Sequence, residues 1–412
     1  MGGRSGMTLQ VLSDQGERST VLEALEHALA AGAAVAVITP QERAALQPVL
    51  EADLPLDLQG PALVLGSGGS RGGRQWCLQP QAQLRLAAEA TAQWLEAIGL
   101  DPSQCELFDP LPLHHISGVM PWVRARQWGA ALRCLSPERM RDPVRLAQQE
   151  PVAADRAALL SVVPTQLERL LGHPEGVRWL QGFALVWVGG AALNDSQAQR
   201  CREWGIRLAP CYGSTETAAM VTALPPDQFL CGVAGCGHPL PHAELRLDPS
   251  TSGLKVRSAS LALARFQVDR WQPLPLDQGW WSSGDRAELT RDGLQVLGRL
   301  DGAIHSGGET VFPDQVEAQV LLLCESQGLP VEELLLLPEP DPLWGERLAA
   351  LVRPRDGAPF SALEPQLQHL AQQLPPAQRP RRWLECPALQ RNAMGKWERQ
   401  HWHQWLSLLE AI

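Results

Sequence analysis

The sequence lacks an excess of positive charge. Its 35 lysines and arginines are outnumbered by 45 aspartates and glutamates, so the formal net charge is −10 at pH 7. Nucleic-acid-binding domains usually carry a basic stripe or patch. Here the basic residues gather only in a short cluster at Arg379, Arg381 and Arg382. We therefore expect no nucleic-acid partner.

The sequence also lacks long apolar runs and paired cysteines. No apolar stretch approaches the roughly 20 residues that a membrane-spanning helix needs, and residues 1–16 have no apolar centre like that of a secretory signal. The nine cysteines are odd in number and form no CxxC pair, a pattern typical of reduced intracellular thiols. We expect a cytoplasmic protein with no membrane span.

Tyrosine is nearly absent, because Tyr212 is the only one in 412 residues, and it lies inside a motif described below. The composition is otherwise ordinary, and 45% hydrophobic residues suffice for a packed core. A chain of this length is expected to form one large domain or two unequal ones.

Strand, turn and helix patterns alternate along the first half of the chain. A helix is expected at residues 18–32, with Ser19 or Thr20 as its N-cap. Residues 207–221 predict a strand followed by the start of a capped helix. Further strands or helices are expected at residues 34–40, 62–74, 84–100, 105–120, 158–171 and 183–205. This rhythm predicts an α/β architecture with a largely parallel sheet.

The pattern changes after residue 222. Short strands with Gly and Pro turns predict a small β unit up to residue 297, and a helix, two strands and another helix follow Asp301. We therefore predict two unequal parts. Residues 1–300 form a large N-terminal domain of layered α/β sheets with the small β unit, and residues 301–412 form a small mobile α+β lid domain.

The segment GSGGSRGGR, residues 66–74, is a glycine-rich loop after a strand. Successive backbone N–H groups in such a loop can converge on an anion and form a phosphate site. The pattern is neither GxxxxGK[ST] nor GxGxxG, so a P-loop or dinucleotide fold is not supported. A flexible surface loop is the alternative.

The segment YGSTETAAM, residues 212–220, places a hydroxyl beside a carboxylate. Thr215 and Glu216 could hold Mg²⁺ against phosphate oxygens. The simpler interpretation is a helix N-terminus with Ser214 or Thr215 as its cap. Both interpretations stay open at the level of sequence.

Asp285 and Lys396 indicate a functional role only when the neighbouring motifs are considered. Asp285 follows Gly284 and is most simply part of a turn. Lys396 ends the polar turn RNAMGK at residues 391–396 and is most simply a solvated side chain. A lysine on a terminal lid can, however, be carried to a site that the rest of the chain builds.

The segment LPLHHISGVM, residues 111–120, carries two adjacent histidines. A metal site is not supported there, because neighbouring side chains diverge and no HExxH spacing accompanies them. Arg124 and Arg126 follow on the same expected helix. A guanidinium suits a substrate carboxylate, and a solvated helix face is the alternative.

Taken in their order along the chain, these motifs resemble those of the acyl-adenylate-forming enzymes, the acyl-CoA synthetase and luciferase superfamily. The resemblance covers roughly residues 60–400. The resemblance implies a phosphate loop with Arg74 at the usual lysine and Arg71 where a glycine is usual. It implies that Thr215 and Glu216 bind the metal. It implies a hinge at Asp301. The nucleotide-binding residues implied are Ser67, Gly68, Ser70, Arg74, Gly189, Gly190, Tyr212, Gly213, Asp285 and Arg299. The catalytic residues implied are Lys396, Glu216 and Thr215.

The substrate side resembles one branch of that superfamily. HISG at residues 115–118 and VPTQ at 163–166 resemble elements of o-succinylbenzoate–CoA ligases. The resemblance implies that ATP and Mg²⁺ activate an aromatic dicarboxylate as an acyl-adenylate, which coenzyme A then captures, in menaquinone or phylloquinone biosynthesis. The substrate-binding residues implied are His115, Ser117, Gly118, Arg124 and Thr165.

Two alternatives remain at this level. One is another acyl- or aryl-CoA ligase. The other is a non-catalytic nucleotide-binding relative, which Arg71 and the short segment of about 65 residues before the phosphate loop favour. From that short segment we expect part of the N-terminal sheet layer to be trimmed. The oligomeric state is left open by the sequence.

Overall fold

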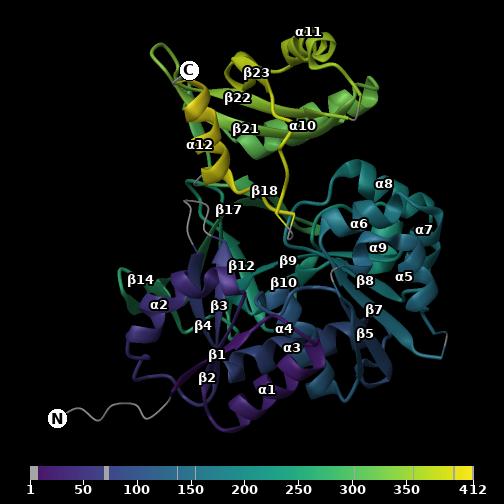
Figure 1. Cartoon of the computed structure of the whole chain (residues 1–412), viewed down its shortest axis with the longest axis vertical. Coiled ribbons are helices and arrows are strands. Elements are labelled where there is room, and N and C mark those ends of the chain that lie inside the picture. The colour runs from purple at the N-terminus through teal and green to yellow at the C-terminus, as the bar shows by residue number, and fades with distance from the viewer. Residues whose placement is uncertain are drawn as a thin grey trace.

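The computed structural model describes residues 8–68, 74–136, 138–153, 155–300, 302–355, 357–392 and 395–410. Figure 1 shows two sheets with their helices in the lower part of the molecule, and a smaller C-terminal part above them. This is the mixed α/β architecture that the sequence predicts.

The first sheet has the strand order β1-β2-β3-β4-β14-β15. Its first three strands are parallel and the others antiparallel. Its strands are β1 Leu9–Ser13, β2 Ala34–Ile38, β3 Ala62–Gly68, β4 Arg74–Pro80, β14 Ala264–Gln267 and β15 Arg270–Pro273. Helices α1 Arg18–Ala30 and α2 Arg43–Glu51 pack on opposite faces of this sheet.

The second sheet has the order β11-β10-β9-β8-β7-β5-β6, and it is parallel from β9 to β6. Its strands are β5 Cys105–Asp109, β6 Ala131–Cys134, β7 Ala157–Val162, β8 Leu185–Val188, β9 Leu208–Ser214, β10 Ala219–Ala223 and β11 His238–Pro239. The central strands of this sheet are largely apolar. Both faces of the sheet are therefore buried under helices, as is usual for parallel sheets.

Helices α3 Gln81–Ala97 and α4 Ile116–Trp128 lie between the two sheets, since each contributes to the core on both sides. The outer face of the second sheet is covered by α5 Pro143–Gln149, α6 Pro164–Leu171, α7 Pro174–Gln181, α8 Asp195–Glu203 and α9 Pro226–Leu230. Arg124 of α4 thus reaches Trp187 of β8 in the interior of the large part.

Part of the predicted small β unit is a five-stranded antiparallel sheet, whereas β11, β14 and β15 of the same stretch join the two larger sheets. The five strands are β12 Ala243–Leu247, β13 Gly253–Ser258, β16 Leu276–Asp277, β17 Trp280–Thr290 and β18 Gly293–Arg299. This sheet packs its own apolar core around Trp281 and Val256.

The C-terminal part has its own sheet and core. Its strands are β19 Ile304–Ser306, β20 Glu309–Val311, β21 Val331–Asp341, β22 Gly345–Pro354 and β23 Arg382–Glu385. Its helices are α10 Pro313–Ser326, α11 Phe360–Leu370 and α12 Arg399–Glu410. The predicted boundary at residue 300 falls between β18 and β19; Asp301 lies outside the described residues, and its role as a hinge stays a prediction.

Two local expectations are wrong. Helix α1 begins at Arg18 with Glu17 at the N-cap, so Ser19 and Thr20 lie inside the helix. After β9 no helix begins; the single 3₁₀ turn Thr215–Thr217 leads into β10, which is antiparallel to β9. Ala218 and Ala219 have φ of 54° and 76°, and these two left-handed residues reverse the chain where a helix start was expected.

Candidate active site

The predicted phosphate loop joins two paired strands. Ser67 and Gly68 end β3 and pair with Gln75 and Arg74 of β4. This hairpin brings both ends of the loop to one edge of the first sheet. Ser70 lies outside the described residues, so its predicted contact with phosphate is not placed.

Glu216 lies over that same edge and is buried. Its carboxylate Oε1 is 3.0 Å from Nη2 of Arg265 on β14. Gln79 of β4 donates a hydrogen bond of 2.6 Å to the carbonyl of Thr215, and Ala262 N–H donates one of 2.7 Å to the carbonyl of Glu216. The turn that carries Thr215 and Glu216 is therefore tied to the first sheet, although it follows a strand of the second.

Tyr212, Asp285 and Arg299 form a hydrogen-bonded group. The Tyr212 hydroxyl donates to Oδ2 of Asp285 at 2.5 Å, and Nη1 of Arg299 is 3.2 Å from Oδ1 of the same carboxylate. Gly284 has φ of 80°, and a Cβ there would lie 2.8 Å from Nη2 of Arg299. Burial and the adjacent carboxylate raise the pKa of Tyr212 well above its usual value, so the phenol remains a donor. These predicted nucleotide-binding residues come from three strands and meet at one place.

The predicted glycines are sites of close backbone packing. A Cβ at Gly213 would lie 1.9 Å from the carbonyl oxygen of Ala219, and one at Gly189 would lie 2.9 Å from Cys211 Sγ. Gly190 has φ of 82°. Gly213 and Gly189 therefore allow the ends of β9 and β8 to pack closely against their neighbours.

Arg124 is not on a solvated helix face, because it is only 4% exposed. Its guanidinium carbon lies 5.1 Å from the centre of the Trp187 ring. Burial lowers its pKa to about 10, while Cys211 and Asp109 oppose that shift. Arg126, two residues on, is exposed and pairs with Glu26.

Unpartnered donors gather around Arg124. Among the described residues, no hydrogen-bond partner lies near Nε of Arg124, Nε1 of Trp187 or either ring nitrogen of His242. Burial, helped by the charge of Arg124, lowers the pKa of His242 to about 4. Buried polar groups are nearly always satisfied, so the N–H groups of Arg124 and Trp187, with the single N–H of the neutral His242 ring, suit an anionic or strongly accepting ligand.

The HISG segment has a structural task as well. Arg18 of α1 donates 2.6 Å and 3.1 Å hydrogen bonds to the carbonyls of Leu111 and Gly118, and it pairs with the buried Asp109. A Cβ at Gly118 would meet the carbonyl oxygen of Pro112 at 2.1 Å. Gly118 therefore allows α4 to start against its own preceding loop.

The expectation that the side chains of His114 and His115 diverge is wrong, because their rings lie together. His114 Nδ1 is 2.5 Å from Oδ2 of Asp14, and the rings of His114 and His115 lie 4.2 Å apart. Among the described residues no three His, Cys, Asp or Glu side chains form a metal-binding group. Ser117 Oγ is buried and has no partner within the described parts of the chain.

The turn that carries Lys396 reaches the large part of the molecule. A Cβ at Gly395 would lie 3.1 Å from Oγ1 of Thr165 at the start of α6. Figure 1 shows the chain after β23 running down toward the large part of the molecule. Lys396 N–H is hydrogen-bonded to Asn392 Oδ1 at 3.0 Å, and its side chain is exposed. A second contact between the two parts joins Ser196 Oγ to Glu325 Oε1 at 2.6 Å.

Three side chains of this region were missed by sequence reasoning: Arg265, Trp187 and His242. Arg265 lies in an ordinary strand pattern, and Trp187 immediately precedes Val188 and the Gly189-Gly190 pair that was noticed. His242 follows a Pro-Leu-Pro turn. Only Trp187, one of fifteen tryptophans, carried a signal that could have singled it out.

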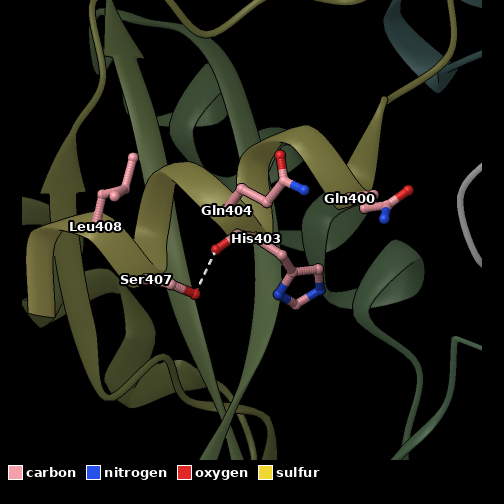
Figure 2. Close-up of a pocket in the computed structure, with 5 residues that line it drawn as sticks. All are labelled: Gln400, His403, Gln404, Ser407 and Leu408. Atoms are coloured by element: carbon pink, nitrogen blue, oxygen red, sulfur yellow. Dashed lines mark hydrogen bonds between the residues drawn. The ribbon is translucent and has the colours of Figure 1, made fainter.

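A hollow elsewhere on the surface contains none of the predicted site residues. It runs along α12 and is lined by Gln400, His403, Gln404, Ser407 and Leu408 (Figure 2). The Ser407 hydroxyl donates to the His403 carbonyl at 2.8 Å, a bond within the helix.

The donors at the phosphate edge fit a magnesium ion that arrives with a nucleotide. Mg²⁺ is usually held by one or two carboxylates together with water and substrate phosphates. Glu216 offers the carboxylate and Thr215 the hydroxyl. The ion would have to share Glu216 with Arg265, which already holds that carboxylate.

The chain matches the AMP-binding enzyme family over residues 10–257 and belongs to that family. Among its relatives are the 2-succinylbenzoate–CoA ligases of Escherichia coli strain K12, at 31% identity over 72% of this chain and 59% of the relative, and of Geobacillus kaustophilus, at 29% over 73% and 61%. The chain thus spans about three fifths of these relatives' length.

Other comparisons agree on the fold. A variant of E. coli MenE with bound OSB-AMS superposes with a TM-score of 0.75 at 25% identity, over 97% of this chain and 88% of that one. The o-succinylbenzoate CoA synthetase of Bacillus subtilis with OSB-AMP gives 0.77 at 20% identity, over the same shares. An indoleacetate–CoA ligase of Aromatoleum aromaticum is 26% identical over 82% of this chain and 66% of the relative. In the described parts of the chain, no helix is long and apolar enough to cross a membrane.

Proposed function

We propose that the chain is an AMP-forming acid–CoA ligase whose acid is o-succinylbenzoate, as in menaquinone or phylloquinone biosynthesis. The observation that supports this most directly is the position of the RNAMGK turn. Gly395 lies against Thr165 of α6, so the adjacent Lys396 is carried to the large part of the molecule. The named 2-succinylbenzoate–CoA ligases among its relatives support the choice of acid.

The chemistry requires a good leaving group, because the oxygen of a carboxylate leaves poorly. In the first step a carboxylate oxygen attacks the α-phosphorus of ATP and pyrophosphate leaves. Lys396 places positive charge where negative charge develops on the α-phosphate, and it holds the two reactants in line. In the second step the thiol of coenzyme A attacks the acyl carbon and AMP leaves.

The other residues of the proposed site position the nucleotide. Asp285, oriented by Tyr212 and Arg299, accepts hydrogen bonds from the ribose hydroxyls. The strand ends that carry Gly189, Gly190 and Gly213 hold the adenine. Ser67, Gly68, Ser70 and Arg74 hold the β and γ phosphates. Bound Mg²⁺ would neutralise part of the triphosphate charge, and Thr215 and Glu216 are the residues we propose to hold it.

The acid lies between α4 and the start of α6 in this proposal, with His115, Ser117, Gly118 and Thr165 around it. Arg124 reads the second carboxylate, and the unpartnered nitrogens of Trp187 and His242 supply further donors. Because Lys396 serves only the first step, the C-terminal part must turn away before the thiol attacks, with Asp301 as the proposed hinge.

The similarity to an indoleacetate–CoA ligase over 82% of this chain favours a second candidate, a ligase for another aryl acid. Acid-dependent AMP release, measured with o-succinylbenzoate, indoleacetate and benzoate, separates the two. The proposal expects a clear preference for o-succinylbenzoate. Equal turnover of the monocarboxylic acids would reject that substrate, and absence of ATP–pyrophosphate exchange with every acid would indicate a nucleotide-binding relative without catalysis.

A further inference from the structure

The ion pair between Glu216 and Arg265 lies where the proposed function places the metal. The two side chains are 10% and 17% exposed, and their charged atoms are 3.0 Å apart. Burying an ion pair is costly unless its geometry is good and further hydrogen bonds satisfy both groups. Here Nε of Arg265 is buried, and no partner for it is found within the described residues. The guanidinium of Arg265 therefore has an N–H donor that no described residue accepts.

Neighbouring side chains hold Arg265 in this position. It pairs in register with Cys77 on β4, so the two side chains lie on the same face of the first sheet. Its guanidinium carbon is 5.5 Å from the centre of the Trp281 ring. The carboxylate on one side and the aromatic ring on the other restrict the direction in which the guanidinium points.

The pair is adjacent to the described start of the phosphate loop. Burial raises the pKa of the Cys77 thiol well above its usual value, and the thiol lies close enough to Ser67 and Glu216 for both to affect that pKa. Cys77 is thus a neutral contact that connects Ser67 with the ion pair. A polyphosphate held at Ser67 and Gly68 would lie within reach of the pair.

We propose that Arg265 binds the polyphosphate end of the nucleotide, and that Mg²⁺ and Arg265 compete for the carboxylate of Glu216. A guanidinium has five N–H donors and matches phosphate oxygens in a bidentate manner. Glu216 holds Arg265 while the site lacks phosphate. Polyphosphate competes with Glu216 for the guanidinium even without metal, and a metal ion on Glu216 frees Arg265 further and so strengthens that binding. This inference rests on the proposed function, since it assumes a polyphosphate at this edge.

The experiment measures binding of inorganic pyrophosphate to the full chain by calorimetry, once in EDTA and once with Mg²⁺. The variants are Arg265→Met, Glu216→Gln, the double variant of both, and the control Arg270→Met. Arg270 lies on the neighbouring strand β15 and is exposed. The double variant leaves no buried charge unpaired, so it serves if Arg265→Met alone is unstable.

The inference expects that wild type binds pyrophosphate without metal. Losing one set of charge-assisted hydrogen bonds should weaken that binding roughly tenfold or more in Arg265→Met and in the double variant. Glu216→Gln should bind metal-free pyrophosphate at least as well as wild type and lose the effect of Mg²⁺. Arg270→Met should match wild type.

Equal metal-free affinity of Arg265→Met and wild type would overturn the inference. So would a wild type that binds pyrophosphate only with Mg²⁺. Binding of AMP, which lacks the β and γ phosphates, distinguishes failure of this inference from failure of the proposed function. If AMP binds normally, only the role of Arg265 is wrong; if neither AMP nor ATP binds, the proposed function is wrong as well.

Discussion

Gly395 and Thr165 lie in direct contact across the two parts of the molecule. A Cβ at Gly395, which has φ of 71°, would be 3.1 Å from both Oγ1 and Cγ2 of Thr165. The turn before Lys396 therefore has room for a hydrogen atom and for little else. We expect the observed arrangement to serve the first step of the proposed reaction, the one that needs Lys396 near the acid.

We expect Lys396→Ala to slow acyl-adenylate formation strongly while leaving the second step intact. Removal of one well-placed transition-state charge typically costs roughly 10²–10³-fold in rate. Thioester formation from pre-made acyl-adenylate should stay near wild type, because Lys396 is carried away before it. Thermal stability should hardly change, since the side chain is exposed. Equal loss in both half-reactions would contradict a role confined to the first.

Gly395→Ala should selectively impair adenylation. The new Cβ meets Thr165 and the backbone is left-handed, which costs roughly 1–2 kcal/mol for a residue with a side chain. Gly357→Ala is the matched control, because Gly357 has φ of 80° and nothing within 4 Å of its Cβ position. Both variants should lose similar stability by calorimetry. Only Gly395→Ala should lose adenylation rate, and a similar loss in Gly357→Ala would show that backbone strain, and not the contact, is responsible.

Arg124→Met should discriminate between acids. The guanidinium is buried over Trp187, and its loss removes a charge-assisted partner worth roughly 1.5–3 kcal/mol to a carboxylate. We expect KM for o-succinylbenzoate to rise about tenfold or more, with little change for a monocarboxylic analogue. Arg126→Met, at an exposed position on the same helix, is the control. Equal losses on both acids would remove the proposed role of Arg124.

Stability should depend on pH through His242. Its folded-state pKa is about 4, against 6.5 for the ordinary group. The neutral ring is therefore favoured by folding, and the stability this contributes is present above pH 6.5 and lost as pH falls toward 4. Between pH 7 and pH 5 the loss should be about 2 kcal/mol.

Denaturant unfolding at several pH values checks this prediction. His242→Gln cannot gain a proton and should lose less stability over the same interval, whereas a substitution at the exposed His238 should not alter the profile. A bound carboxylate near Arg124 should raise the pKa of His242, so binding of o-succinylbenzoate near pH 5 should take up protons. Identical pH profiles for wild type and His242→Gln would contradict the assignment.

The alternating pattern of the first half was sufficient to predict the parallel strands β5, β7, β8 and β9 and the helices α6 and α8, whereas β6, α5, α7 and α9 were not predicted. Periodicity is a local property, and the apolar runs at residues 158–162 and 185–188 are long enough to specify buried strands. The same reasoning failed at residues 215–219. There a single turn with two left-handed alanines redirects the chain, and alanine carries no signal for that conformation.

Some residues of the candidate site could likewise be predicted from the sequence, and others could be found only in the structure. Sequence alone determined the residues carried by motifs, among them Tyr212, Glu216, Asp285 and Lys396. Only the tertiary structure revealed that Arg265 pairs with Glu216, that His242 and Trp187 lie near Arg124, and that Gly395 touches Thr165. A motif is visible because neighbouring residues act together, whereas a buried pair such as Glu216 and Arg265 joins strands that are distant in sequence. Its energy depends on desolvation and on geometry within a few ångströms, and both exist only once the chain is folded.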